Sequence, residues 1–460
     1  MKTKGLTKVK KNLTIKEYIY VASMLFGLFF GAGNLIFPVH MGQEAGSAFL
    51  PATLGFLVTG VGLPLLGVAA LGMSKSTGLY DLSSKVNPFF AMFFTCALYL
   101  SIGPCFAIPR CATTSFTVGI EHILPEGANS QLFLLIFTSL FFIAALLFSL
   151  YPGKILTWVG KILNPAFLLF LAILVIVALL NPSISVKEVE VAESYSLSPF
   201  FKGFIEGYNT MDALASLAFG IIVVDVIKSL GVKEEGDIAK NTVLSGVFSC
   251  LLMALIYFAT TLVGAQSRGL FAVSDNGGIA LAEIAHHYLG TAGFYILAIT
   301  VTLACLKTSV GLITSCSETF SELFKKGPSY RAWVFIFTAF SFLVSNIGLS
   351  NIISISLPVL MFLYPFTITL PLLALCGKLF NNDRAVYNSV IAFTTVGCIY
   401  DFLASLPSSA QALPVISHII ALLKNLPFSS LGLGWICPAL TGLVIGILIY
   451  ETRKKKAVRG

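Results

Sequence analysis

The sequence predicts an all-α integral membrane protein of about twelve transmembrane helices, arranged as a 5+5 inverted repeat followed by two C-terminal helices. Hydrophobic residues make up 57% of the 460 residues and charged residues only 11%, less than half the roughly 25% of soluble domains. Two of its long apolar runs, at corresponding places in the chain, are interrupted by glycine and polar residues. The composition excludes a water-soluble globule, a disordered chain and, despite a net charge of +8, a nucleic-acid-binding protein.

The apolar runs are each long enough to cross a bilayer as a helix. Continuous runs of this length exclude a membrane β-barrel, the other structure that satisfies the backbone in lipid. The basic N-terminal segment leads into a long apolar run without the features of a cleaved signal, so the first run is expected to be retained. The expected spans are 17–40, 47–73, 88–120, 130–150, 155–181, 204–229, 240–265, 290–322, 331–348, 350–376, 385–405 and 429–450.

The distribution of basic residues orients these spans. With the N-terminus inside, 23 of the 29 lysines and arginines fall in cytoplasmic segments and four in outer ones. This bias predicts a multi-pass protein of the cell membrane with both termini in the cytoplasm. The expected parts are a cytoplasmic N-terminus 1–16, a first repeat 17–181, an outer loop 182–203, a second repeat 204–376, helices eleven and twelve 377–450, and a cytoplasmic tail 451–460.

Two spans carry residues that interrupt a membrane helix. The first span contains LFGLFFGAGNLIFP, and the sixth contains GYNTMDALASLAFG. Corresponding interruptions in two halves are typical of a transporter site between broken helices. Two intramembrane cations, Arg110 and Lys307, also occupy matching places in the two halves. Close helix packing through glycine is the alternative explanation for the first interruption taken alone.

A pair of broken helices can bind a zwitterion without charged side chains. Each break exposes N–H groups on one half and carbonyls on the other, and the helix dipoles add partial charges of matching sign. The N–H groups around Gly33 and Asn34 would bind a carboxylate. Carbonyls near Phe29, Phe30 and Ala215 would bind an ammonium group or a cation. The surrounding residues are apolar, which favours a small zwitterion with an apolar side chain.

Other polar residues leave alternatives open. Asp212, beside the second interruption, would either hold the ammonium group or cap a helix. Arg110 would either clasp an acidic residue in a gate or pair with one permanently. The nine cysteines lie in apolar segments without a C-x-x-C pair, which indicates buried inert thiols. The sequence has no Walker loop, no catalytic cluster of ionisable groups and no filter repeat, so it indicates a secondary transporter instead of an ATP-driven pump, an intramembrane enzyme or a channel.

Four segments carry a family resemblance: FGLFFGAGNLIFPVHMGQEAG (26–46), GPCFAIPR (103–110), GYNTMDALASLAFG (207–220) and TLACLKTSVGLITSCSE (302–318). With them the chain resembles the branched-chain amino acid:cation symporters. The resemblance implies uptake of leucine, isoleucine and valine with Na⁺ or H⁺ by alternating access, in a leucine-transporter-type fold. It implies no cofactor, no ATPase subunit and no nucleic acid, with an amino acid and the lipid bilayer as partners. The alternative is a proton-coupled permease for another small apolar amino acid.

The resemblance also assigns residues. Those implied at the substrate are Ala32, Gly33, Asn34, Ala215, Ser216 and Phe219, with Asp212 beside them. Those implied at a sodium ion are Gly27, Phe30, the carbonyl of Cys305, Thr308 and Ser309. Lys307 departs from the family pattern, in which the residue before the Thr–Ser pair is often uncharged. It would either take the cation's electrostatic role, which favours proton coupling, or face elsewhere, since one residue is about 100° around a helix.

Overall fold

The structure is a computed structural model that describes residues 10–459 except 75, 126 and 151–153. The side chains of 28, 122, 154–164, 166, 167, 221 and 457–459 also lie outside the description. Residues 1–9 of the predicted N-terminal segment are therefore outside the described part of the chain. Among the basic residues that contribute to the predicted charge bias, Lys75 and the side chains of Lys154, Lys161 and Arg459 are outside it as well.

The first half of the chain is helical from Ile15 onward. Its α-helices are α1 Ile15–Phe29, α2 Ala32–Ala45, α3 Phe49–Leu57, α4 Leu63–Met73, α5 Leu79–Ser84, α6 Pro88–Leu100, α7 Ala107–Gly119, α8 Ser130–Leu150 and α9 Lys154–Leu180. Its short elements are the 3₁₀ turns η1 Gly46–Ala48, η4 Glu121–Ile123 and η5 Val186–Glu188, and the π-helical turns η2 Val58–Gly62 and η3 Ser101–Cys105.

The second half continues in the same way. Its α-helices are α10 Glu193–Ser196, α11 Pro199–Glu206, α12 Asp212–Ser229, α13 Glu235–Ser267, α14 Gly277–Leu323, α15 Tyr330–Ser345, α16 Leu349–Cys376, α17 Arg384–Ala404, α18 Ser408–Gln411, α19 Pro414–Leu423 and α20 Ile436–Arg459. The 3₁₀ turns are η6 Gly207–Thr210, η7 Gly377–Phe380 and η8 Ser429–Leu431.

The predicted all-α membrane fold is confirmed. Eight helical segments of the described residues are long and apolar enough to cross a membrane, and three further apolar helices are shorter. The first and sixth predicted spans are each divided by a break. A broken helix consists of two short helices in place of one long one. Counting helices by their length therefore does not give the expected twelve membrane spans.

Some predicted boundaries differ from the structure. The last span was expected at 429–450, but α20 begins at Ile436 and continues through the predicted tail to Arg459. Gly432, in a left-handed conformation with φ of 69°, ends the preceding turn and delays the helix, and the lysine-rich tail favours helix once it has begun. The predicted outer loop 182–203 contains α10 and the start of α11.

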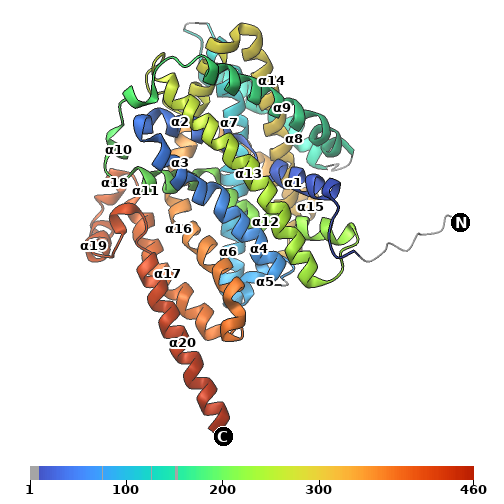
Figure 1. Ribbon diagram of the computed structural model, residues 1–460, viewed down its shortest axis with the longest axis vertical. Coiled ribbons are helices and arrows are strands. Elements are labelled where there is room, and N and C mark those ends of the chain that lie inside the picture. Colours follow the sequence, from blue (N-terminus) through green and yellow to red (C-terminus); the bar gives the residue numbers. More distant parts are fainter. Residues whose placement is uncertain (1–9, 75, 126, 151–153, 460) are drawn as a thin grey trace, which may run out of the picture.

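The long helices α13 and α14 organise the packing. Helix α2 packs against both of them, α12 packs against α4, and α7 packs against α14. At the other end of the sequence α17 and α20 pack along each other, and α20 projects away from the remaining helices (Figure 1). The two broken segments therefore lie within the bundle, and the C-terminal pair lies apart from them.

Helices α2 and α13 approach closely through glycine. A Cβ on Gly42 would lie 2.9 Å from the backbone nitrogen of Ala265, and one on Gly264 would lie 2.9 Å from the carbonyl carbon of Val39. Neither distance leaves room for a side chain against backbone atoms. This contact holds the first broken segment against the C-terminal part of α13, about two turns from the buried Tyr257.

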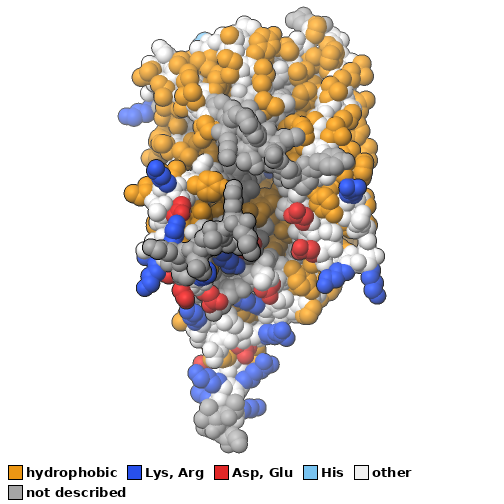
Figure 2. All heavy atoms as spheres, turned by 90° about the vertical axis from the view of Figure 1, so that its right-hand side faces the viewer, with side chains coloured by type: hydrophobic (Ala, Val, Ile, Leu, Met, Phe, Trp, Pro, Cys, Tyr) orange, Lys and Arg blue, Asp and Glu red, His pale blue; other side chains and the backbone are white. Residues whose placement is uncertain are grey.

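The surface suits a lipid environment. Large apolar side chains such as Leu140, Leu169 and Leu255 are exposed, which a monomer in water rarely tolerates over a whole face. Figure 2 shows hydrophobic side chains over the upper part of one face, with most of the charged side chains gathered toward the end from which α20 projects.

Candidate functional site

The first break lies between α1 and α2. Helix α1 ends at Phe29, Phe30 and Gly31 are extended, and α2 begins at Ala32. The N–H of Gly31 is bound by Oδ1 of Asn34 at 2.8 Å. The N–H groups in the first turn of α2, including those of Ala32 and Gly33, have no carbonyl of a preceding helical turn to bind. The break therefore presents donors at the start of α2 in the interior of the bundle.

The second break lies between η6 and α12. Met211 has a left-handed backbone, with φ of 61°, an unfavourable conformation for a residue with a long side chain. Oγ1 of Thr210 donates to the carbonyl of Gly207 at 2.9 Å and accepts from the N–H of Asp212 at 3.3 Å. This short turn interrupts the helix and leaves the carbonyl of Asn209 outside the helical ladder.

One predicted group at the second break is not available. Carbonyls near Ala215 were expected to be free, but Ala215 lies inside α12, whose hydrogen bonding begins before it with the bond from the Ala215 N–H to the carbonyl of Met211. The break comes earlier in the chain than the interruption suggested, because Met211 and not a later residue takes the left-handed conformation. The Ala215 carbonyl is therefore part of a continuous helix.

A buried hydrogen-bond cluster joins the two breaks. Nδ2 of Asn34 donates to Oδ2 of Asp212 at 2.5 Å and also to the hydroxyl of Tyr257. That hydroxyl donates in turn to Oδ2 of Asp212 at 3.0 Å. All three side chains are at most 2% exposed. The Asn34–Asp212–Tyr257 cluster thus ties the start of α2 to the start of α12 and to α13. Sequence reasoning missed Tyr257, because a single hydroxyl in a long apolar helix gives no pattern.

Arg110 contacts both breaks. From α7, its Nη1 donates to the carbonyl of Asn209 at 2.8 Å, and its guanidinium carbon lies 5.3 Å from the centre of the Phe37 ring on α2. A Cβ built on Gly33 would lie 3.1 Å from that ring and 3.5 Å from the same carbonyl oxygen. The partner of Arg110 is thus a backbone carbonyl and not the acidic side chain that both sequence interpretations assumed. Nε of Arg110 has no hydrogen-bond partner among the described residues.

Helix α14 lies against the first break. The Cβ position of Gly31 is 3.5 Å from Cγ2 and 3.8 Å from Oγ1 of Thr308. The hydroxyl of Ser309 is buried without a partner in the described part of the chain. Cys111 of α7 lies beside Cys305 and Ser309. No sequence signal distinguishes Cys111 from the other cysteines in apolar runs.

A small cavity beside the first break has room for about one water molecule. It brings together Gly27, Phe30, Cys305 and Lys307, four of the residues predicted for the cation site and its coupling. Lys307 is thus among the residues that line a cavity at the first break.

The predicted substrate residues on α12 are not all near the first break. Oγ of Ser216 donates to the carbonyl of Ala213 at 2.6 Å, and a Cβ on Gly67 of α4 would lie 3.1 Å from the Ser216 Cβ. Ser216 therefore faces α4. Phe219 is buried with an exposed fraction of 5%.

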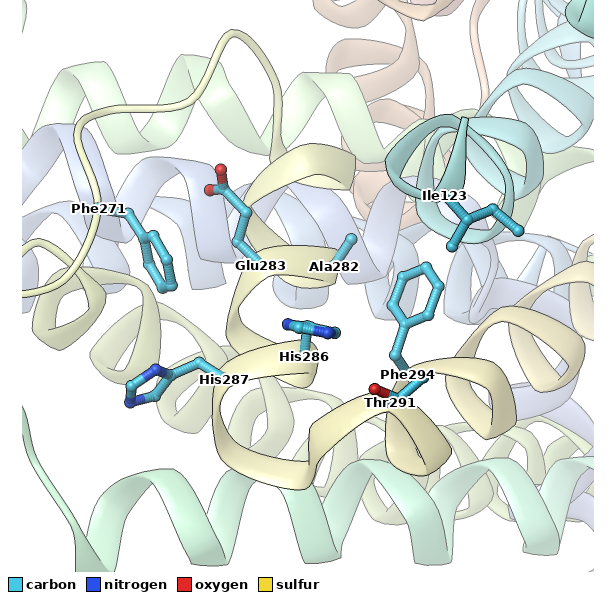
Figure 3. A pocket seen from close by; sticks show the side chains of 8 residues that line it. All are labelled: Ile123, Phe271, Ala282, Glu283, His286, His287, Thr291 and Phe294. Carbon is cyan, nitrogen blue, oxygen red and sulfur yellow. The ribbon is translucent and has the colours of Figure 1, made fainter. Parts of the chain in front are cut away.

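A separate hollow of about 280 Å³ lies where α14 bends at Gly290. Figure 3 shows His286 beside Phe294 within it, while His287 and Glu283 point in other directions. No group of three or more histidine, cysteine or acidic residues in the described ranges is placed to hold a metal ion. This hollow is therefore distinct from the broken helices in both position and chemistry.

Comparisons with known proteins agree on one family. A family model described as "Branched-chain amino acid transport protein" matches residues 14–453. The branched-chain amino acid permease BrnQ of Lactobacillus delbrueckii subsp. lactis is 48% identical, with 98% of this chain and 100% of that protein aligned. BrnQ of Bacillus subtilis is 40% identical, over 97% of this chain and 100% of its own. The solved structure of MHP1, a nucleobase-cation-symport-1 family transporter, shares the fold at a TM-score of 0.59 and 13% identity, covering 95% of this chain and 93% of that one.

Proposed function

The chain belongs to the branched-chain amino acid transport protein family, and from this premise we propose that it takes up leucine, isoleucine and valine with a coupling cation by alternating access. It is a multi-pass membrane transporter of branched-chain amino acids and not an enzyme. We place it in the cell membrane with both termini in the cytoplasm, because 23 of its 29 lysines and arginines fall on that side.

One observation carries the proposal: the two helix breaks are joined by a buried hydrogen-bond cluster. The N–H groups of Ala32 and Gly33 would bind the substrate carboxylate, which the positive end of the α2 dipole favours. Freed carbonyls of Phe29 and Phe30 would bind the ammonium group. Phe219 would contact the apolar side chain. Asn34 and Asp212 would act as positioning residues, because their side chains already bind each other.

We propose that the coupling ion is a proton carried by Lys307. Lys307 lines the small cavity together with Gly27, Phe30 and Cys305, three of the positions that the resemblance assigns to sodium. An ammonium group there would place a positive charge where Na⁺ would bind, and like charges at short distance repel strongly in a buried site. Buried lysines also change protonation more readily than other basic side chains. Lys307 would gain a proton when the site is open to the outside of the membrane and lose it when the site is open to the cytoplasm.

Purified protein in proteoliposomes tests both proposals. Uptake of labelled leucine is measured under a pH gradient and, separately, under a sodium gradient. We expect saturable uptake that an inward proton gradient drives and that unlabelled isoleucine and valine inhibit. Uptake that only a sodium gradient drives would contradict the proton assignment alone. Inhibition by alanine but not by isoleucine or valine would instead favour a permease for another small apolar amino acid.

Thr308→Ala and Ser309→Ala are expected to weaken the response to the coupling gradient. The Thr308 hydroxyl lies beside the first break, and the buried Ser309 hydroxyl lies beside Cys111. Both can accept or relay a hydrogen bond from a charged group. Such bonds contribute about 1.5–3 kcal/mol, so the cation concentration at half-maximal uptake should rise about tenfold or more. Thr302→Ala, two turns earlier on α14, serves as the control. An unchanged pH or sodium response in both variants would reject the assignment.

Arg110→Met is expected to lower leucine uptake at least about tenfold. The substitution leaves the buried carbonyl of Asn209 without its donor, a cost of about 1–3 kcal/mol, and removes the contact that holds η6 toward α2. Uptake is measured in vesicles together with the thermal unfolding midpoint of the purified variant. Lost uptake at a nearly unchanged midpoint would support a positioning role in transport, whereas unchanged uptake would refute it.

A further inference from the structure

A large pocket of about 870 Å³ lies at the end of the bundle that the charge bias assigns to the cytoplasm. Three lysines line it from three separate parts of the chain: Lys85 follows α5, Lys240 lies in the first turns of α13, and Lys378 lies in η7. Glu235, at the start of α13, is the one carboxylate among the lining residues of this pocket. The lining therefore carries a net positive charge, although these lysines are between 138 and 293 residues apart in the sequence.

Part of the pocket lining is apolar. Val243, Leu244 and Val247 come from α13, and Ala374 and Leu375 come from the end of α16. Leu244 is 37% exposed, so this wall opens to the outside of the bundle. A pocket with a basic end and an open apolar wall, at the level where membrane helices end, matches an amphiphilic anion and not a small soluble one.

Lys85 is the most enclosed of the three cations. Its Nζ donates to the carbonyl of Ser74 at 3.3 Å. Burial lowers the pKa of Lys85, and the nearby Asp81 carboxylate opposes that change only in part. Lys85 shares this pocket with Lys240 and Lys378. An anion bound there would therefore be attracted by three ammonium groups.

We propose that this pocket binds the phosphodiester headgroup of an anionic phospholipid, with its acyl chains along the apolar wall. Lys85, Lys240 and Lys378 would contact the phosphate, and Val243, Leu244 and Val247 would contact the first methylenes of the chains. The lining residues of the site come from α4, α13, α16 and η7. A lipid bound there would link helices that lie far apart in the sequence. The inference rests on the proposed orientation, and it does not depend on the substrate or the coupling ion.

The proposal is tested by native mass spectrometry and thermal unfolding of the full-length protein, delipidated in detergent. Three probes are compared: phosphatidylglycerol, phosphatidylcholine and inorganic phosphate. We expect phosphatidylglycerol to be retained and to raise the unfolding midpoint, and the other two to do neither. Equal retention of phosphatidylcholine would overturn the charge argument. An equal effect of inorganic phosphate would overturn the lipid assignment in favour of a free anion.

The double variant Lys240→Gln/Lys378→Gln tests whether the lipid binds in this pocket. Each lysine near an anionic headgroup contributes about fivefold to binding, so retention of phosphatidylglycerol should weaken about 30-fold. Lys187→Gln/Lys424→Gln, on exposed segments assigned to the outer side, is the matched control and should retain the lipid. Should the Gln variant fold poorly, Lys240→Arg/Lys378→Arg keeps the charge and is expected to bind. Lipid retention equal to that of the unaltered protein in a folded Gln variant would refute the site. Lipid binding is measured independently of transport. The result of this experiment can therefore be interpreted even if the transport proposal fails.

Discussion

Gly33→Leu is expected to abolish leucine uptake while the protein still inserts into the membrane. A Cβ at this position would already lie 3.1 Å from the Phe37 ring and 3.5 Å from the Asn209 carbonyl oxygen. The rest of a leucine side chain would fill the space between the two breaks and cover the N–H groups at the start of α2. Transport should therefore fall to the background of membranes without the protein, because no substrate carboxylate could reach its donors.

Two variants make this result interpretable. Gly33→Ala adds one methyl group, which Phe37 accommodates by moving a few tenths of an ångström, so reduced but measurable uptake is expected. Gly62→Leu places the same bulk on an exposed position of another membrane segment, 3.8 Å from the nearest backbone oxygen, and should leave uptake near normal. Membrane levels of each variant are measured beside uptake. Normal leucine uptake by Gly33→Leu would remove the first break from the substrate site.

Lys307→Met is expected to abolish accumulation driven by a pH gradient and to leave exchange of internal for external leucine. Methionine fills a similar volume beside Gly27 and Phe30 but carries no proton, so substrate movement would no longer be linked to proton movement. Lys307→Arg should also fail to accumulate leucine, because a guanidinium group stays charged at all accessible pH values and cannot complete a proton cycle. Both effects are measured in proteoliposomes, with counterflow of labelled leucine as the exchange assay.

The control for this pair is Lys325→Met, which removes an exposed lysine just after α14 and should leave coupling intact. Full accumulation by Lys307→Met under a pH gradient would exclude Lys307 as the proton carrier. Accumulation that becomes dependent on sodium in the same variant would instead agree with it, since removal of the ammonium group would clear the cavity for another cation.

Much of the fold was predictable because each membrane helix must satisfy its own backbone. A run such as 130–150 is apolar and uninterrupted, and α8 has the same bounds. The positions of both interruptions were also visible, since Gly31 and the segment around Asn209 stand out within apolar runs. Their consequences in space were less predictable: the left-handed residue at the second break is Met211, which no propensity favours.

The partners within the candidate site depended on packing between distant segments. Asn34 meets Asp212 and Tyr257 only because Gly42 and Gly264 allow α2 and α13 to touch. Contacts between distant segments also explain the error at Arg110. An acidic side chain was expected as its partner, but the structure places a backbone carbonyl there. Periodicity describes one helix at a time, and it contains no information about which neighbour faces a given side chain.

By itself, the sequence determined that this protein lies in a membrane as helices, that two of those helices are interrupted, and that its motifs resemble one transporter family. Each of these follows from local chemistry, namely the transfer of apolar side chains into lipid and the backbone freedom of glycine. The tertiary structure alone decided that Lys307 lines a cavity at the first break, that Ser216 faces α4, and that three distant lysines share one pocket. Those outcomes depend on the rotation and contact of whole helices, which are set by the packing of many side chains at once.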